Sequence, residues 1–338
     1  MANIFLTRKC NLKCPYCFAD EFVNKKNEEV TLENFEKILN FIKKDGTSRI
    51  GLIGGEPTLH PKFNKILDIL NNDDNIKEII IYTNGIKIDK FLNKLNKDKY
   101  SILINCNSPE DIGKSYKKLE ENILKTYNLL KDKCTLGINL YSDKLNYSYI
   151  FGLLKSINSH SLRFSVAIPN EIKENTFDII SSFKKFKPFL FEFFKDCLKE
   201  EIVPYFDCNS FPDCFYTLED KKILIQLSEL AKKMEQNKIP GTIASCKTCA
   251  PVIDILPDMT AVRCFGLSKY LKKPIFEYRT LTNLEKYFYN QIDLYARLSF
   301  ITDKCENCNL RLLNKCGICY TYKLDKMEKL KNFVKQNI

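Results

Sequence analysis

Three cysteines lie within one short stretch near the start of the chain, TRKCNLKCPYCFADEF (residues 7–22). Cys10, Cys14 and Cys17 stand there without a fourth cysteine, and neither of the two histidines of the chain falls in this stretch. A structural zinc site needs four nitrogen or sulfur ligands in closed tetrahedral geometry. Three thiolates on a short loop instead suit a four-iron cluster in which one iron stays open.

Twelve further cysteines bring the total to fifteen, a large number for a chain without a secretion signal. Metal binding or redox chemistry is therefore expected, and a disulfide framework is not. Cys106, Cys134 and Cys197 are isolated and are expected to be small buried hydrophobes. Seven cysteines gather near the C-terminus: Cys246, Cys249, Cys264, Cys305, Cys308, Cys316 and Cys319.

The composition is that of an ordinary globular protein, with 338 residues, 44% of them hydrophobic and 28% charged. The net charge of +11 comes mostly from lysines interspersed with acidic residues in helical stretches, which is typical of a solvated surface. We therefore expect no nucleic-acid partner. No apolar run reaches 18 residues, which predicts no membrane span and a cytoplasmic protein.

The first two hundred residues alternate apolar, β-branched runs with amphipathic helical patterns. Such alternation predicts an α/β fold with a parallel sheet covered by helices, here a partial (β/α)6 barrel of the TIM type. Ligands of such barrels gather at the C-terminal ends of the strands. The expected strands are residues 3–7, 49–54, 78–83, 101–105, 135–140 and 162–168, with a seventh at 202–208.

The sequence divides into three expected parts. The α/β barrel covers residues 1–215, a helical connector covers 216–240, and a cysteine-rich module covers 241–338. A terminal helix is expected at residues 324–337.

The cysteine spacing C-x3-C-x2-C after a first strand, with Tyr16 before the last cysteine, resembles the radical S-adenosylmethionine (SAM) enzymes. GGEP, residues 54–57, ends the second expected strand and resembles the segment that binds the SAM methionine in that family. YTNG, residues 82–85, lies at the end of the third expected strand. The order and spacing of these motifs carry the resemblance, which spans residues 1 to about 210.

The resemblance implies that Cys10, Cys14 and Cys17 bind a [4Fe–4S] cluster whose fourth iron holds SAM. It implies a low-potential electron donor such as ferredoxin or flavodoxin, and a 5′-deoxyadenosyl radical that abstracts hydrogen from the substrate. Arg163 is expected to hold a carboxylate, or else to be a surface arginine. The residues expected to contact SAM or its cluster are Tyr16, Phe18, Gly54, Gly55, Glu56, Pro57, Thr83, Asn84, Asn105, Asn107, Asn139 and Arg163.

The cysteine-rich tail resembles the SPASM extension of radical SAM enzymes, which binds one or two auxiliary iron–sulfur clusters. By that resemblance a first cluster takes Cys246, Cys249, Cys264 and Cys319, and a second takes Cys305, Cys308 and Cys316. The tail departs from the pattern because Met259 replaces the usual glycine and no cysteine follows Cys319. One cluster therefore has an open site, borrows a ligand, or is absent. A zinc ribbon is the competing interpretation.

The seventh expected strand ends at Asp207 and Cys208, with Cys214 beyond. We expect Asp207 and Cys208 to act on the substrate. A cysteine at this place could donate a hydrogen atom, accept a proton or supply the missing cluster ligand. Simple packing is the alternative for these cysteines.

The predicted function is modification of a peptide or protein side chain by crosslinking, epimerisation or oxidation. One alternative is a radical SAM dehydrogenase or epimerase acting on a small molecule. The early cysteine loop leaves little room for an N-terminal peptide-recognition domain, which weakens the leader-peptide case. Another alternative, outside the enzymes, is an iron–sulfur electron carrier or zinc-binding module. GGEP argues against that alternative, because a carrier needs no SAM site.

Overall fold

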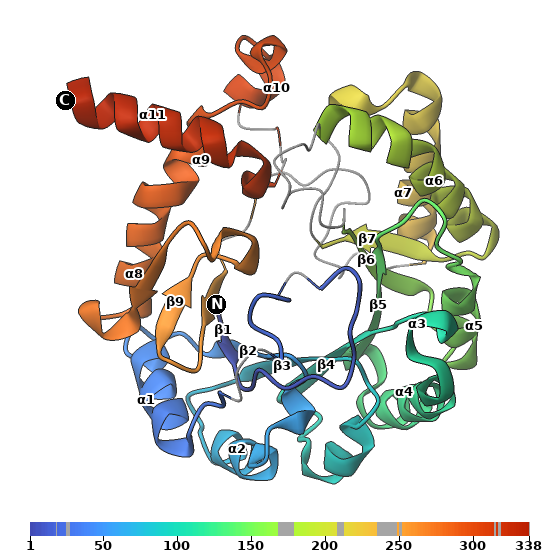
Figure 1. Ribbon diagram of the computed structural model, residues 1–338. Helices are drawn as coiled ribbons and strands as arrows, with labels where there is room; N and C mark the ends of the chain where they lie inside the picture. The colour runs from blue at the N-terminus through green and yellow to red at the C-terminus, as the bar shows by residue number, and fades with distance from the viewer. Residues whose placement is uncertain are drawn as a thin grey trace. The chain divides into compact units, whose positions relative to one another are not determined.

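The computed structural model describes residues 1–17, 19–24, 28–167, 179–207, 213–234, 249, 252–313, 316 and 319–337 (Figure 1). The chain forms two compact units, each built from separate stretches of sequence. The first comprises Met1–Asn105, Ile112–Thr135 and Ala250–Tyr295, and the second comprises Cys106–Asp111, Leu136–Cys249 and Ala296–Ile338. The three parts expected from the sequence are continuous stretches of chain and do not coincide with these two units. That division into three parts stays a prediction.

The sheet of the first unit has the strand order β10-β9-β8-β1-β2-β3-β4. The first four strands along the chain are parallel neighbours, and β8, from the cysteine-rich tail, pairs in parallel with the other edge of β1. A hairpin continues the sheet through β9 and β10. The strands are β1 (Ala2–Phe5), β2 (Arg49–Ile53), β3 (Glu78–Thr83), β4 (Tyr100–Asn105), β8 (Ile253–Ile255), β9 (Thr260–Val262) and β10 (Lys272–Pro274).

Strand β1 is the centre of this arrangement because it has a partner on each side. Ala2 pairs with Ile50 of β2 and with Ile253 of β8, and all four residues of β1 are buried. A strand covered on both faces is expected to be mostly apolar, and the one polar residue of β1, Asn3, is hydrogen-bonded to Asp254.

Helices α1 and α2 lie on one side of the first four strands (Figure 1). Thr31 caps α1 by accepting a hydrogen bond from the Asn34 amide at 3.1 Å. Both helices bury a stripe of apolar residues against the sheet and expose the lysines. The helices of this unit are α1 (Leu32–Lys43), α2 (Phe63–Asn71), α4 (Tyr116–Leu130) and α8 (Leu281–Phe288), with a 3₁₀ segment at Ile88–Lys94.

The second unit has the parallel strands β5, β6 and β7 in that order. The long helix α6 and helix α7 contact each other and β7, and Phe164 of β6 packs on Phe193 and Phe194 of α6. The strands are β5 (Cys134–Leu140, its first two residues in the first unit), β6 (Ser161–Val166) and β7 (Val203–Phe206). The helices are α3 (Pro109–Ile112), α5 (Ser148–Ser156), α6 (Ile179–Lys199), α7 (Leu218–Lys233), α9 (Leu294–Leu298), α10 (Asn309–Leu312) and α11 (Leu324–Asn337).

The predicted α/β class with parallel strands is confirmed, and each expected strand is present with its ends shifted by two residues at most. The terminal helix occupies the expected residues. Within the described part of the chain, no helix has the length and apolar character needed to cross a membrane.

A buried carboxyl group lies where β8 meets β1. Asp254 is buried and accepts a hydrogen bond from the Asn3 side-chain amide at 2.8 Å. Burial raises the pKa of Asp254 to about 7, although the Asn3 hydrogen bond and the nearby Arg263 both oppose the shift. Arg263 itself forms a buried bidentate ion pair with Asp293.

Asp254 gives the protein a pH-dependent stability. An unfolded aspartate has a pKa of about 4, so between about pH 4 and about pH 7 the folded chain binds more protons than the unfolded chain. The free energy of unfolding should therefore fall as the pH rises through this range. Asp254→Asn should flatten that dependence in anaerobic urea titrations, whereas Asp132→Asn, at an exposed turn, should keep it. Identical pH profiles for the wild type and Asp254→Asn would contradict this assignment.

Candidate active site

The cysteine loop follows β1 directly and is shaped by its own backbone. The amide of Cys17 donates to the Cys14 carbonyl at 3.1 Å. Asn24 closes the loop from its far end: its side-chain oxygen accepts from the Cys10 amide at 2.9 Å, and its side-chain nitrogen donates to the Cys10 carbonyl at 3.2 Å. Asn24 adopts a left-handed backbone with φ 57°, which asparagine tolerates better than most residues. The side chain of Asn24 thus fixes the loop at Cys10.

The glycine pair of GGEP lies against the start of this loop. The Gly55 amide donates to the Thr7 carbonyl at 2.8 Å, and the Glu56 amide donates to the Lys9 carbonyl at 2.8 Å. A β-carbon on Gly55 would lie 2.4 Å from the Lys9 oxygen, and one on Gly54 would lie 2.8 Å from the Thr7 oxygen. Glycine is required here because backbone meets backbone with no room for a side chain.

Glu56 ties the ends of β2 and β3 together. Its carboxylate is buried and accepts hydrogen bonds from the hydroxyls of Thr58 at 2.6 Å and Thr83 at 2.7 Å, and from the Asn84 amide at 2.8 Å. Burial raises the pKa of Glu56, and these hydrogen bonds oppose the rise. Pro57 follows as the first residue of a 3₁₀ turn, Pro57–Leu59. Groups of the chain itself therefore satisfy this carboxylate.

Two more side-chain contacts join the cysteine loop to the ends of the neighbouring strands. The Asn84 side-chain nitrogen, after β3, donates to the Asn11 side-chain oxygen at 2.9 Å. The Asn105 side-chain nitrogen, at the end of β4, donates to the Tyr16 hydroxyl at 2.8 Å. The first unit thus brings the loop together with the ends of β2, β3 and β4, where the sequence predicts the cofactor.

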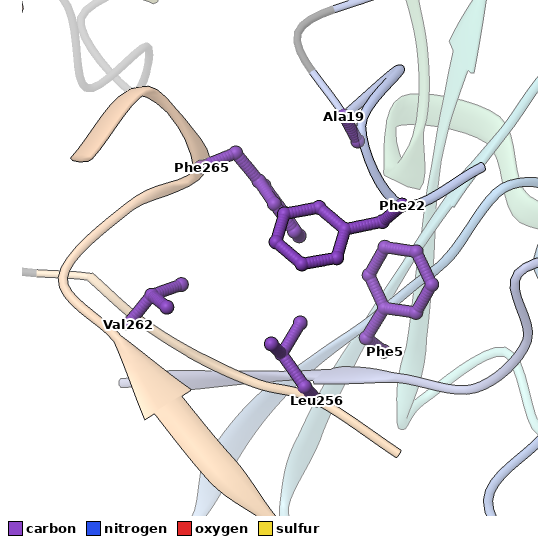
Figure 2. Close-up of a cluster of buried hydrophobic side chains, with 6 residues drawn as sticks. All are labelled: Phe5, Ala19, Phe22, Leu256, Val262 and Phe265. Carbon is purple, nitrogen blue, oxygen red and sulfur yellow. The ribbon is translucent and has the colours of Figure 1, made fainter. Parts of the chain in front are cut away.

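A hydrophobic cluster holds the other side of the loop. Figure 2 shows Ala19 and Phe22 of the loop with Phe5 of β1 and Phe265 after β9. The rings of Phe22 and Phe265 have centroids 5.7 Å apart, and each also contacts Phe5. Cys17 packs against the same cluster. The cysteine-rich tail therefore contributes directly to the packing of the N-terminal cysteine loop.

The donor set of the loop fits a four-iron cluster. Burial raises the pKa of Cys10 to about 11, and the negative charges of Glu56 and Cys17 add to the shift. Thiols bind metal as thiolates, so cluster assembly must remove this proton. No three Cys, His, Asp or Glu side chains converge on a single-ion site anywhere in the described ranges. Around one zinc ion four thiolates lie within about 4 Å of one another, whereas a cluster spreads its thiolates over separate irons.

In the second unit the predicted residues form two pairs. The Arg163 guanidinium of β6 bonds to the Asp207 carboxylate after β7, and the Ser165 hydroxyl donates to the Asn139 side-chain oxygen. Asn107 is buried. Arg163 and Asp207, expected to serve cofactor and substrate separately, are thus each other's partners.

The tail cysteines fall in both units. Cys264 belongs to the first unit, and Cys249 and Cys319 belong to the second. Cys305, Cys308 and Cys316 line one cavity of the second unit together with Cys214. Phe18, Cys208 and Cys246 lie outside the described residues. The ligand sets predicted for two auxiliary clusters remain predictions.

The structure adds several residues that the sequence did not indicate. Asn11 and Asn24 fix the cysteine loop through side-chain amides, and Lys323 lies buried beside the tail cysteines. Asn11 is next to Cys10 in the sequence, which is a weak indication that it belongs to the site. Nothing in the sequence around Asn24 or Lys323 indicates their roles.

Residues 4–144 match the radical SAM superfamily. The chain carries a radical SAM domain. The expected family is thereby confirmed, and with it the cofactors of that superfamily, a [4Fe–4S] cluster and SAM. The residues that bind them stay predicted.

Sequence relatives match less than half of the chain. Human molybdenum cofactor biosynthesis protein 1 is 31% identical over 157 residues, covering 42% of this chain and 25% of that protein. GTP 3′,8-cyclase from Haemophilus influenzae is 33% identical over 90 residues, covering 26% of this chain and 27% of the enzyme. The match spans about a quarter of the length of these relatives.

Similarity of structure extends over nearly the whole chain. SuiB from Streptococcus suis, solved with S-adenosylmethionine, superposes with a TM-score of 0.62 at 17% identity, over 95% of this chain and 72% of that one. The enzyme anSMEcpe with AdoMet bound gives 0.61 at 16% identity, over 98% and 99%. At such identities the likeness establishes a shared fold.

Gly55→Ala should displace the cysteine loop, because the new methyl group would overlap the Lys9 carbonyl. We expect a loss of stability of about 1–3 kcal/mol, in the range of overpacking, and a loss of iron from this loop. Gly152→Ala is the matched control, since a β-carbon on Gly152 in α5 meets nothing within 4 Å. Iron content and thermal midpoint are the measurements. Native values in Gly55→Ala would show that the loop does not depend on this contact.

Proposed function

We propose that the protein is a radical SAM enzyme that modifies a side chain of a peptide or protein substrate. The observation that carries the proposal is the loop of Cys10, Cys14 and Cys17 held at the ends of β2, β3 and β4.

In this proposal the three thiolates hold a [4Fe–4S] cluster with one iron left for SAM. The bound cofactors supply reductive cleavage of SAM and abstraction of hydrogen from carbon. Asn24 and Gly55 fix the loop, and Glu56 keeps the ends of β2 and β3 in register. The work of the protein is to orient the reacting groups and to exclude water.

Support for a peptide substrate comes from the structural relatives. SuiB was solved with precursor peptide SuiA, and anSMEcpe with the Kp18Cys peptide. Both share their fold with this chain through its tail, where we propose a SPASM-like module with auxiliary clusters. The products are a crosslink, an epimer or an oxidised side chain. We propose ferredoxin or flavodoxin as the electron donor and the cytoplasm as the location.

A second candidate is a small-molecule substrate. It is favoured by the relatives named GTP 3′,8-cyclase, whose sequence identity to this chain is higher, at 31–33%, but covers only 26–35% of it.

Replacing Cys10, Cys14 and Cys17 together with Ala should abolish cleavage of SAM to 5′-deoxyadenosine, because no other residues hold the cluster that delivers the electron. Auxiliary iron should remain, since none of these three cysteines is among its proposed ligands. Chromatographic assay of 5′-deoxyadenosine and iron analysis after anaerobic reconstitution are the measurements. Cys197→Ala, which removes a buried thiol of α6, is the control and should cleave SAM normally. Cleavage that persists in the triple variant would overturn the proposal.

The substrate class can be tested on the wild-type protein. Peptides containing Cys, Ser or Thr should stimulate formation of 5′-deoxyadenosine and should change in mass, because substrate binding positions the hydrogen to be abstracted. GTP should do neither. Stimulation by GTP with consumption of the nucleotide would favour the small-molecule candidate.

A further inference from the structure

Four cysteines from two distant stretches line one cavity of the second unit. The cavity has a volume of about 50 Å³. Cys305, Cys308 and Cys316 come from the tail, and Cys214 comes from the 3₁₀ turn Asp213–Phe215 that precedes α7. Some ninety residues separate Cys214 from the nearest of the other three. Cys214 is therefore distant from the three tail cysteines in sequence, but lines the same cavity in the folded protein.

The three tail cysteines sit on a backbone folded around them. The Cys305 amide donates to the Thr302 carbonyl at 2.8 Å, and the Cys308 amide donates to the Cys305 carbonyl at 3.2 Å. Arg311 fixes this turn from the side, because its guanidinium donates to the carbonyls of Cys305 at 2.9 Å, Leu298 at 3.1 Å and Glu306. Two successive turns thus present thiols to the cavity.

A buried cation lies beside these thiols. Lys323 also lines the cavity, is 4% exposed, and donates to the Ala296 carbonyl at 2.9 Å. No carboxylate forms a salt bridge with Lys323 among the residues that the structure describes. A buried ammonium is costly unless negative charge accompanies it.

Four thiolates around a cluster supply that negative charge. Cys214 is exposed at the surface, and Cys305, Cys308 and Cys316 are partly buried. A cluster bound by these four thiolates would be anionic and would lie next to Lys323.

We propose that Cys214 is the fourth ligand of an auxiliary iron–sulfur cluster held by Cys305, Cys308 and Cys316. This inference deepens the proposed function and rests on it, because that function includes auxiliary clusters in the tail. It resolves the shortage of ligands. The ligand missing after Cys319 is then supplied from upstream.

A cluster suits this cavity better than a zinc ion. Four cysteines could also bind zinc. The radical SAM domain at residues 4–144 makes iron–sulfur the consistent choice for these thiols.

The test uses the full chain in which Cys10, Cys14 and Cys17 are already replaced with Ala, so that only auxiliary iron is counted. The protein is reconstituted anaerobically with ferrous iron and sulfide. Adding Cys214→Ala should lower the iron content by between about one and about four irons per chain, for a partial or a complete loss of one cluster. The EPR spectrum of the reduced protein should lose or change one component. Cys197→Ala in the same background should change neither.

Cys214→Ser separates ligand loss from misfolding, because a serine oxygen at a ligand position keeps iron and alters the EPR spectrum. Native iron and a native spectrum in both Cys214 variants would overturn the inference and leave the proposed function intact. Equal loss of iron in Cys214→Ala and Cys197→Ala, with a native spectrum in Cys214→Ser, would overturn it as well. A parent protein with no iron, or with zinc in its place, would overturn both the inference and the proposed auxiliary clusters.

Discussion

The close backbone contact between the first strand and GGEP is the constraint on which the N-terminal site depends. Pairing of β1 with β2 continues past the strand ends through bonds of 2.8 Å from Leu6 to Ile53, from Gly55 to Thr7 and from Glu56 to Lys9. A side chain at Gly55 would separate the two segments. Since the cysteine loop begins at Cys10, immediately beyond the last of these bonds, its position is inherited from the sheet. Loops carry function well when a rigid scaffold positions them in this way.

Polar and apolar contacts hold opposite sides of that loop. On one side the amides of Asn84 and Asn105 reach Asn11 and Tyr16, so the loop is joined to the strand ends. On the other side Phe22 packs between Phe5 and Phe265. Loss of an aromatic side chain from such a cluster typically costs about 3–5 kcal/mol. The loop is thus part of the hydrophobic core as well as the place where the cofactor is expected.

Much of this arrangement could be predicted from the sequence. The strands are short apolar runs whose periodicity is local, and the cysteine spacing and GGEP lie within single turns of chain. The structure brings the cysteine loop and GGEP together at the strand ends, and the cofactor site expected there stays a prediction. What the sequence could not predict are contacts between distant segments. The pairing of β8 with β1, the closure of the loop by Asn24 and the approach of Cys214 to Cys305 depend on the folded topology.

Glu56 and Arg163 were expected to contact cofactor groups because of their positions at strand ends. Carboxylates and guanidinium groups at strand ends suit ligand binding, and the chain contains few arginines. The structure pairs each with groups of the protein: Glu56 with Thr58, Thr83 and Asn84, and Arg163 with Asp207. Local sequence does not reveal such a partner when it lies on another strand.

The hairpin of β8 and β9 has a consequence for the order of events during synthesis. The cysteine loop leaves the ribosome first, but Leu256, Val262 and Phe265, which cover it, are made more than two hundred residues later (Figure 2). Contacts of such long range form late and slowly. The first cysteines of the nascent chain therefore wait for nearly all of the polypeptide before their environment is complete, and a product truncated before Leu256 would lack half of the cluster that packs against Cys17.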